Sequence, residues 1–240
     1  MHYKIALFKI GGKILENFEN LNSTISQLTQ LYNENLINKI VIIPGGGSFA
    51  NFIREVYNEL KFTEDIAHWM GIISMNYNGL KLKNKFPEFE VFKDLMKLKK
   101  INRTLSIFLP YEFLKETNNL PHSWDVTSDS ITLYIAGELG LKECFLIKDV
   151  DGILDDKNRV IKEILASEFK ELKKRKKLAG VKSNIDELKE RSTPIDIYTT
   201  TLIEKLKISC FILNGSKNMA RILNYFTSTN KAEQIFTKIK

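Results

Sequence analysis

Apolar residues along the chain fall into two kinds of segment, which alternate from the N-terminus onward. Short runs of β-branched and aromatic residues are typical of buried strands, and they occupy Tyr3–Ile10, Lys39–Ile43, Thr104–Leu109, Glu143–Ile147 and Ser209–Leu213. Between them, apolar residues recur every three or four positions, which predicts helices at Phe18–Asn35, Ser48–Leu60, Thr63–Leu80, Thr127–Leu139, Tyr198–Leu206 and Asn218–Phe226. This alternation indicates an α/β fold, a three-layer αβα sandwich with a largely parallel central sheet.

Weaker patterns add four elements. Two further strands are expected at Glu90–Phe92 and Gln234–Ile239, a hairpin at Ile153–Ile161, and a polar helical stretch at Lys162–Lys189. In the predicted helix Ser48–Leu60, Ser48 stands where an N-cap belongs, and the residues expected to point inward are Phe49, Phe52, Ile53, Val56 and Leu60. The chain contains no linker rich in Pro, Gly or Ser, so residues 1–240 are expected to form a single domain.

Three predicted strands end in glycine or aspartate. The first ends in Lys9-Ile10-Gly11-Gly12, the second in Pro44-Gly45-Gly46-Gly47-Ser48, and the third in Lys148-Asp149-Val150-Asp151-Gly152. Ligands of such sheets bind beyond the carboxyl ends of the strands, so the three turns can share one cleft. Backbone N–H groups at a glycine-rich helix start suit phosphate, and Lys9 adds a positive charge, so the pattern predicts phosphoryl chemistry.

Each of these motifs also has a plainer interpretation. The triple glycine is not a Walker A loop, because no Gly-Lys-Ser/Thr follows, and it fits a dinucleotide pattern poorly because Asp65 opens a helix. The Asp-Val-Asp-Gly turn lacks the later ligands of a calcium loop. The helix start Trp124–Ser130 holds more acids and hydroxyls than capping needs, and its Asp129 is a candidate partner for Lys9 or a metal-bound phosphate. A lone histidine on an apolar helix, such as His68, is more often structural than functional.

Composition narrows the class of protein. Hydrophobic residues make up 43% of the chain and charged residues 27%, which is ordinary for a globular protein, and no apolar run is long enough to span a bilayer. The net charge of +7 is diffuse apart from Lys173–Lys177, and no aromatic residues interleave with that run, so nucleic acid is not an expected partner. Cys144 and Cys210 are expected to be buried free thiols, and no cluster resembles a metal site. A strand follows the N-terminus at once, so we expect no signal peptide and a cytoplasmic location.

Taken in order, the motifs resemble those of the amino acid kinase superfamily. They are the Lys-x-Gly-Gly turn, the Gly-Gly-Gly-Ser turn, the Ser-Asp helix start and the Asp-Val-Asp-Gly turn, and they cover residues 3 to about 155. Ala67–Met70 and Ser123–Asp129 most resemble the small archaeal-type kinases of methanofuran biosynthesis, which convert an aminomethyl-furanmethyl phosphate to its diphosphate. The sequence departs from isopentenyl phosphate kinases at Ala50–Asn51.

The resemblance implies a role for each matching residue. Lys9 would stabilise the transferred phosphoryl group, and Asp129 would position the lysines. The residues implied at the nucleotide are Gly11, Gly12, Lys148, Asp149, Asp151 and Gly152. The residues implied at the acceptor are Gly45, Gly46, Gly47, Ser48, His68, Trp124, Asp125 and Ser128. An acceptor-binding lobe at about 1–142 and a nucleotide-binding lobe at about 143–240 follow from the same comparison.

The expected activity is therefore ATP-dependent transfer of a phosphoryl group to a small anionic acceptor, with Mg²⁺ as cofactor and a homo-oligomer as the assembled form. A monophosphate acceptor is favoured, because the motifs offer lysines, N–H groups and an aspartate but no obvious general base. The alternatives are an isopentenyl phosphate, uridylate, carbamate or amino-acid acceptor, or a non-catalytic nucleotide or oxyanion binder. Relatives use a second lysine for which no motif matches; Lys182 and Lys217 are the candidates.

Overall fold

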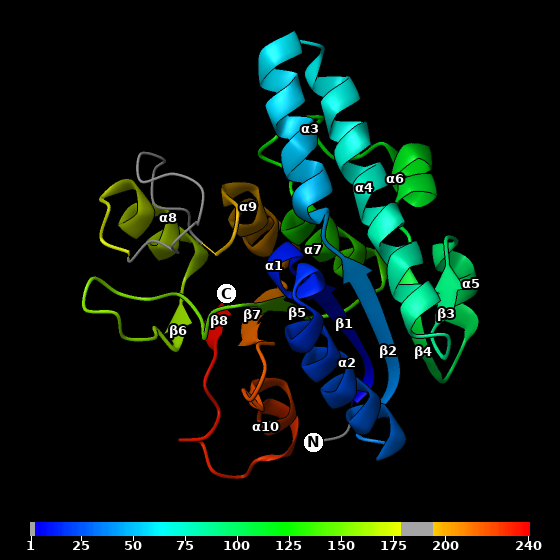
Figure 1. The fold of residues 1–240 in the computed structure, drawn as a ribbon. Coiled ribbons are helices and arrows are strands. Elements are labelled where there is room, and N and C mark those ends of the chain that lie inside the picture. The colour runs from blue at the N-terminus through cyan, green and yellow to red at the C-terminus, as the bar shows by residue number, and fades with distance from the viewer. Residues whose placement is uncertain (1–2, 179–193) are drawn as a thin grey trace.

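One continuous sheet forms the centre of the protein. The computed structural model describes residues 3–178 and 194–240, and its sheet has the strand order β3-β4-β2-β1-β5-β7-β8-β6 (Figure 1). Neighbouring strands are parallel except for the antiparallel pair β7–β8. The strands are β1 (Tyr3–Ile10), β2 (Ile37–Pro44), β3 (Glu90–Phe92), β4 (Thr104–Phe108), β5 (Glu143–Lys148), β6 (Glu163–Ile164), β7 (Ser209–Asn214) and β8 (Thr237–Ile239).

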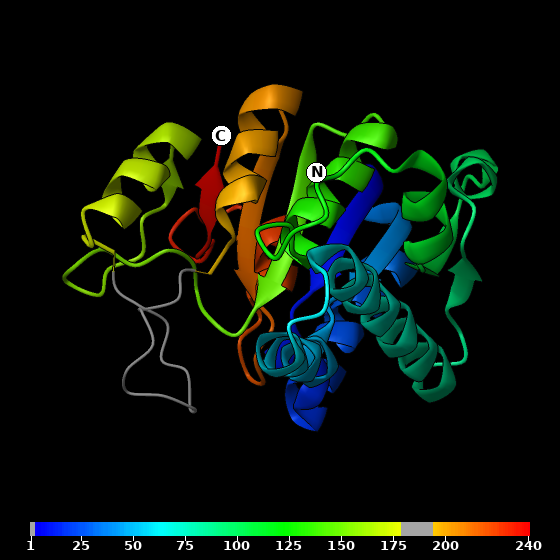
Figure 2. The same cartoon turned by 90° about the horizontal axis from the view of Figure 1, so that it is seen from above.

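Helices cover both faces of this sheet, because successive side chains of each central strand point to opposite sides. From β1, Phe8 and Ile10 pack into the cluster formed with α1 (Gly12–Glu16), α2 (Phe18–Asn33) and α10 (Arg221–Thr227). Leu7 packs into the opposite cluster, whose helices are α4 (Glu64–Lys85), α5 (Leu95–Lys100), α6 (Tyr111–Thr117), α7 (Ser128–Glu138), α8 (Ala166–Lys174) and α9 (Ile197–Leu206). Figure 2 shows the two helical layers on either side of the strands, which confirms the predicted three-layer sandwich.

Several local expectations need correction. The helices α1, α5 and α6 were not predicted, because elements of five to seven residues are too short for a helical period to show. In the segment expected to be helical from Lys162 to Lys189, the structure has β6, then α8, and residues 179–189 lie outside the described part of the chain. The hairpin is confirmed by an antiparallel bridge between Leu154 and Val160. The division into two lobes stays a prediction.

The two cysteines face each other across neighbouring strands. Cys144 of β5 and Cys210 of β7 are in register, and both are buried free thiols with their Sγ atoms 3.6 Å apart, as expected. Among the helices of the described residues, none is both long enough and apolar enough to cross a membrane.

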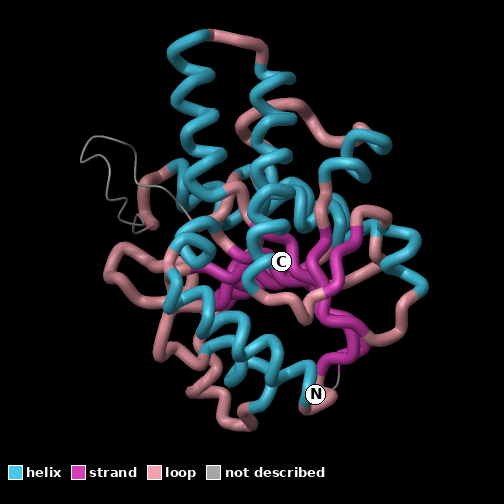
Figure 3. The backbone as a smooth tube through the Cα atoms, turned by 45° about the vertical axis from the view of Figure 1, so that its right-hand side comes forward, coloured by secondary structure: helices cyan, strands magenta, loops and turns pink. Residues whose placement is uncertain are grey.

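Two long helices rise from the carboxyl end of the sheet as a pair. They are α3 (Gly47–Leu60) and α4 (Glu64–Lys85), joined at the point farthest from the strands (Figures 1 and 3). The prediction that all five apolar residues of α3 point inward is wrong: Ile53 is buried, Val56 is half-buried, and Phe49, Phe52 and Leu60 are exposed. The reason is that α3 extends past the sheet and has α4 as its main neighbour.

The outer side of α4 carries an apolar stripe that faces solvent. Ile66, Met70, Ile73, Tyr77 and Leu80 are all exposed, and they recur at alternating spacings of four and three residues, as in a coiled-coil seam. The opposite side of the same helix is buried through Ala67, Ile72, Met75 and Leu82. A helix with two apolar faces needs two neighbours, and the described chain supplies one of them.

Candidate active site

Two glycine-rich turns meet at the carboxyl edge of the sheet. The Gly11 N–H donates to the Ile147 carbonyl at 2.8 Å, and the Gly45 N–H donates to the Ile10 carbonyl at 2.9 Å, so each turn is fixed to the neighbouring strand. A Cβ atom on Gly12 would lie 2.8 Å from the Cα atom of Gly47, so the two turns touch each other. Two of the three turns that were expected to share a cleft therefore lie side by side.

Three charged groups, of which Lys9 and Asp129 are buried and Lys148 is half-buried, stand beside these turns. The Asp129 carboxylate, from the first turn of α7, accepts Lys9 Nζ at 2.7 Å and Lys148 Nζ at 2.6 Å. Lys9 and Asp129 are each only 4% exposed. A Cβ atom on Gly11 would lie 3.0 Å from the Ile147 carbonyl oxygen, so this glycine allows the close approach of its turn to β5.

The protonation of this cluster follows from burial and from the pairing of charges. Burial lowers the pKa of Lys9 from 10.5 to about 8, and the nearby Lys148 ammonium lowers it further, while Asp129 opposes both effects. Burial alone would raise the pKa of Asp129, but the ammonium groups of Lys148 and Lys9 outweigh it and hold the pKa below its usual range. Two cations thus share one anion, and the cluster keeps an excess positive charge for a ligand.

A second aspartate, missed in the sequence, holds Asp129 in place. Asp196 Oδ2 accepts the Thr127 hydroxyl at 2.5 Å and the Ser130 N–H at 3.4 Å, both at the start of α7. Its other oxygen accepts the Thr199 N–H at the start of α9. Burial raises the pKa of Asp196, and the nearby Asp129 raises it further. The N-termini of α7 and α9 are joined by this one carboxylate, which makes Asp196 a positioning residue for Asp129.

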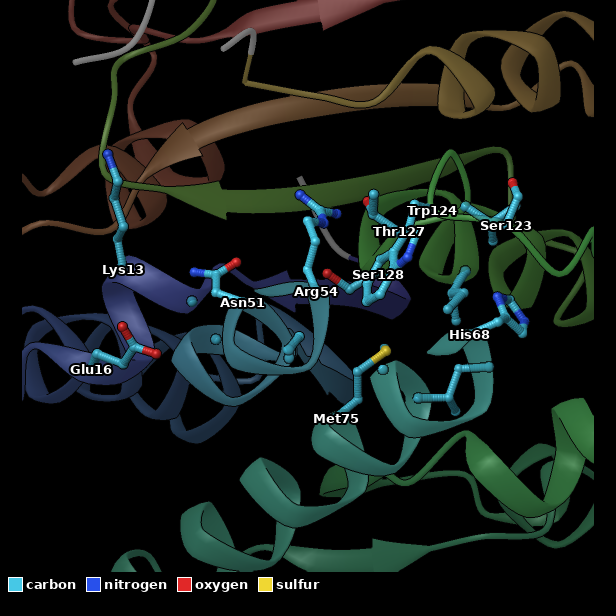
Figure 4. Close-up of a pocket in the computed structure, with 18 residues that line it drawn as sticks. Lys13, Glu16, Asn51, Arg54, His68, Met75, Ser123, Trp124, Thr127 and Ser128 are labelled. Carbon is cyan, nitrogen blue, oxygen red and sulfur yellow. The ribbon is translucent and has the colours of Figure 1, made fainter. Parts of the chain in front are cut away.

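A cavity of about 280 Å³ opens beside the turns, between α1, α3, α4 and the start of α7 (Figure 4). Its walls include six residues singled out from the sequence, namely Gly12, Gly46, Gly47, His68, Trp124 and Ser128. They also include Lys13, Glu16 and Arg54, which no sequence motif marked. Ile72, Met75 and the Trp124 ring supply an apolar wall.

His68 lies in this cavity as a neutral side chain. It is buried, and its ring stacks on that of His122 with centroids 4.8 Å apart. Burial lowers the pKa of His68 to about 4, and the adjacent His122 lowers it further. His122, which no sequence pattern marked, in turn contacts Asp65 and Asn118. At neutral pH His68 can therefore offer a hydrogen bond to a ligand but no positive charge.

The structure takes other predicted acceptor residues away from the cavity. Asp125 is exposed and is not among the residues that line it. Ser48 is not the N-cap of α3, since the helix begins one residue earlier, at Gly47, which has a φ of +61°. The Ser48 N–H donates to the Glu16 carboxylate, which reaches it from the end of α1. A carboxylate thus occupies the backbone donor that was expected for phosphate.

Neighbouring side chains pack so closely around Gly46 that they leave no space for a Cβ atom. A Cβ atom there would lie 2.5 Å from the Ala50 Cβ atom and 2.7 Å from the Ser74 hydroxyl of α4. The glycine therefore serves the packing of α3 against α4 as well as the opening of the cavity. A larger side chain at this position is expected to lower both stability and ligand affinity.

The residues of the third turn form ion pairs and packing contacts with other parts of the protein. Asp149 Oδ2 lies 3.2 Å from Lys13 Nζ, and Asp151 pairs with Arg221 Nε at 2.9 Å. Gly152 is buried with a φ of +148°, and a Cβ atom on it would lie 2.3 Å from the Thr237 hydroxyl. Close packing against Thr237 therefore explains why residue 152 is a glycine. Contact of Asp149, Asp151 and Gly152 with a nucleotide stays a prediction.

Lys148, which the sequence marked as part of the third turn, is the second lysine that contacts Asp129. Its Nζ atom reaches both oxygens of Asp129, at 2.8 and 2.6 Å. Of the two other candidates, Lys217 contacts Glu19 on the surface, and Lys182 lies outside the described residues. The strand position of Lys148 was visible in the sequence, but its partner was not.

These features define a class of protein. Buried lysines at glycine-rich turns, at the carboxyl edge of a parallel sheet, form a site for moving charged phosphoryl groups. The protein is accordingly a phosphotransferase, and it belongs to the amino acid kinase family, whose profile matches residues 4–214.

Comparison with individual known proteins shows which members of the family the chain is similar to. It is 28% identical to a [5-(aminomethyl)furan-3-yl]methyl phosphate kinase of Methanocaldococcus jannaschii over 97% of this chain and 96% of that protein. It is 24% identical to an acetylglutamate kinase of Endomicrobium trichonymphae over 74% of this chain and 84% of that protein. The fold is similar to those of UMP kinase from Ureaplasma parvum (TM-score 0.68, 17% identity, 100% and 97% covered) and uridylate kinase from Archaeoglobus fulgidus (TM-score 0.66, 18% identity, 99% and 100% covered).

Replacing Lys9 by methionine should lower kcat by at least about 10²-fold, since we expect its charge to stabilise the transition state. The fold should survive, because Lys148 keeps Asp129 paired. Steady-state kinetics and thermal unfolding measure the two effects, with Lys4→Met, an exposed site on the same strand, as the control. A kcat near that of the parent protein would remove Lys9 from catalysis.

The kcat/KM for the nucleotide should fall as the pH rises above about 8. Lys9 loses its proton through that pKa, and the neutral amine no longer attracts a phosphate. Above it the decline should approach tenfold per pH unit. Profiles of kcat/KM between pH 6 and 10 test this, and a flat profile to pH 10 would show that Lys9 keeps its charge in the free enzyme.

Proposed function

We propose that this kinase transfers the γ-phosphoryl group of ATP to a small phosphate monoester and releases ADP and a diphosphate. The observation that carries the proposal is the Lys9–Asp129–Lys148 cluster at the meeting point of the two glycine turns. The first candidate acceptor is [5-(aminomethyl)furan-3-yl]methyl phosphate, named for the Methanocaldococcus jannaschii relative.

The cavity supports a small, flat acceptor. Its volume of about 280 Å³ lies at the small end of ligand pockets, which run from roughly 300 to 1,000 Å³. The Trp124 ring, Ile72 and Met75 suit an unsaturated or apolar body, and the neutral His68 suits a hydrogen bond. A free amino acid would need paired sites for its carboxylate and ammonium groups; Lys13, Glu16 and Arg54 also line the cavity, so an amino-acid acceptor stays among the alternatives that the screen below tests.

The chemistry needs little from the protein beyond charge and position. An oxygen of the acceptor phosphate is already ionised at neutral pH, so no general base has to remove a proton. That oxygen attacks the γ-phosphorus in line, the bond to the β–γ bridging oxygen breaks, and ADP leaves with the electron pair. Lys9 and Lys148 neutralise the charge on the transferring group, and Asp129 keeps the two ammonium groups together.

Magnesium is expected to arrive with the nucleotide. Among the described residues, no group of three or more His, Cys, Asp and Glu side chains gathers to hold a metal, and both lysines of the cluster contact the Asp129 carboxylate. Mg²⁺ commonly keeps several waters and binds through substrate phosphates, so this site fits an ion held by the phosphate oxygens of ATP. Two buried free thiols agree with a reducing cytoplasm as the location.

We also infer that the protein forms a homodimer through the outer stripe of α4, defined by Ile66, Met70, Ile73, Tyr77 and Leu80. A contiguous exposed stripe of this kind is typical of an interface rather than of a monomer surface. The first turn of α4 is acidic, with Glu64 and Asp65, and its last turn is basic, with Lys83 and Lys85. Antiparallel pairing with a second copy brings each acidic end to a basic end.

Changing Ile73 to glutamate should convert the dimer to a monomer, because a charge would be buried at the centre of the seam. Light scattering after size-exclusion chromatography measures the mass, with Met96→Glu, an exposed apolar site on α5, as the control. If the parent protein is a monomer at micromolar concentration, or Ile73→Glu keeps the mass of the parent, this interface is wrong.

Furan phosphate should give the highest kcat/KM in an ADP-release screen that also contains isopentenyl phosphate, UMP, acetylglutamate, aspartate and carbamate. His68→Ala should then raise the KM for the acceptor several-fold and leave the KM for ATP unchanged, because His68 lines the acceptor cavity. Met96→Ala, an exposed site on α5 that does not line the cavity, is the control.

The outcomes of the screen separate the alternatives. Preference for an amino acid or carbamate would contradict the assignment of a monophosphate acceptor but would agree with the assignment of the protein as a kinase. ATP binding without turnover of any acceptor would favour a non-catalytic nucleotide binder.

A further inference from the structure

An arginine that no motif marked reaches across the cavity. Arg54 extends from α3 toward the loop that precedes α7, and its guanidinium carbon lies 4.7 Å from the centroid of the Trp124 ring (Figure 4). Both residues line the cavity, with Ser128 at the same wall. Stacking on an aromatic face fixes the plane of a guanidinium group and leaves its N–H donors free at the edge.

The charge of Arg54 has no acidic partner in the described residues, where no carboxylate lies within 4.0 Å of it. Three other arginines of the same part of the chain are paired, Arg159 with Asp155, Arg175 with Glu171 and Arg221 with Asp151. Arg54 as a whole is exposed to solvent, although desolvation by neighbouring atoms lowers its pKa. The cavity therefore contains a positioned cation available to an anion.

A second polar group of the same cavity also lacks a partner within the protein. The Trp124 Nε1 atom is buried, and no acceptor among the described residues lies within hydrogen-bond distance of it. A buried indole N–H without an acceptor costs free energy, so it usually has one. The Arg54 charge without an acidic partner and the unsatisfied Trp124 N–H come from touching side chains at the cavity wall, and together they indicate a ligand with acceptor oxygens.

We propose that Arg54 and Trp124 form the subsite that binds the phosphate of the acceptor, an inference that rests on the proposed function. Arg54 binds two oxygens of a phosphate monoester through its planar fork, and Trp124 holds that fork in place with its indole N–H available to the same ligand. The remaining phosphate oxygen forms the new bond to the γ-phosphorus. Arg54 thereby selects a phosphate acceptor over a neutral alcohol.

A binding experiment tests the subsite without turnover. The chain has two tryptophans, so Trp69→Phe leaves Trp124 as the fluorescent reporter. Methyl phosphate is titrated into this protein with ADP present to fill the donor site. We expect a saturable change in fluorescence, because an anion on Arg54 alters the cation over the ring. Arg54→Met, which keeps an apolar stem on the ring, should weaken binding by about 10- to 100-fold.

Two further variants sharpen the test. Arg54→Lys keeps the charge but loses the fork, so its affinity should lie between those of the parent and Arg54→Met. Arg103→Met is the matched control, since Arg103 stacks on Tyr32 at 4.2 Å and donates to the Tyr32 carbonyl, away from the cavity. Thermal unfolding checks that each variant is folded. Unchanged affinity in Arg54→Met, or no saturable change in the parent, would overturn the subsite.

Kinetics distinguish this proposal from the proposed function. With furan phosphate, Arg54→Met should raise the KM for the acceptor by about 10- to 100-fold and leave the KM for ATP unchanged. Turnover that is insensitive to Arg54→Met would contradict the subsite and keep the kinase reaction. Loss of methyl phosphate binding in Arg54→Met, in a protein that turns over no acceptor of the screen, would support the subsite and contradict the phosphate kinase.

Discussion

The Asp129 carboxylate, shared by Lys9 and Lys148, is the interaction on which the site depends. Each of these charges would be costly to bury alone, and removing one partner of such a pair typically costs about 3–5 kcal/mol. The three charges are tolerable together because the ammonium groups lie within 2.6–2.8 Å of the carboxylate oxygens. Strand β1, strand β5 and helix α7 must therefore be in register before the cluster can form.

The same cluster explains why the surrounding residues are small or strongly hydrogen-bonded. Gly45 leaves space beside the Lys9 side chain, and Asp196 fixes the start of α7, which carries Asp129. With two cations against one anion, the site has an unpaired positive charge before any substrate arrives. Electrostatic stabilisation that is already in place requires no reorganisation during phosphoryl transfer.

The fold and about half of the site residues could be predicted from the sequence. Lys9, Gly11, Gly12, Gly45 and Asp129 were found because glycines and charges at strand ends stand out against apolar runs. Lys148 was placed at the correct strand end, yet its pairing with Asp129 depends on how α7 packs beside β5, which no local pattern encodes. The cavity residues Glu16 and Arg54, and Asp196 behind Thr127, lie in helical segments or caps, where a charge usually indicates a solvated surface.

The apolar residues of α3 were predicted to point inward, but most of them are exposed, because α3 packs mainly against α4 and not against the sheet. Periodicity shows that a helix has an apolar face but not what covers that face. Here α4 exposes its stripe on one side and lines the cavity with His68, Ile72 and Met75 on the other. One helix thus links the outer surface to the acceptor wall, so a partner that covers the stripe would also restrict the motion of that wall. Assembly and acceptor affinity are expected to be coupled through α4 for this reason.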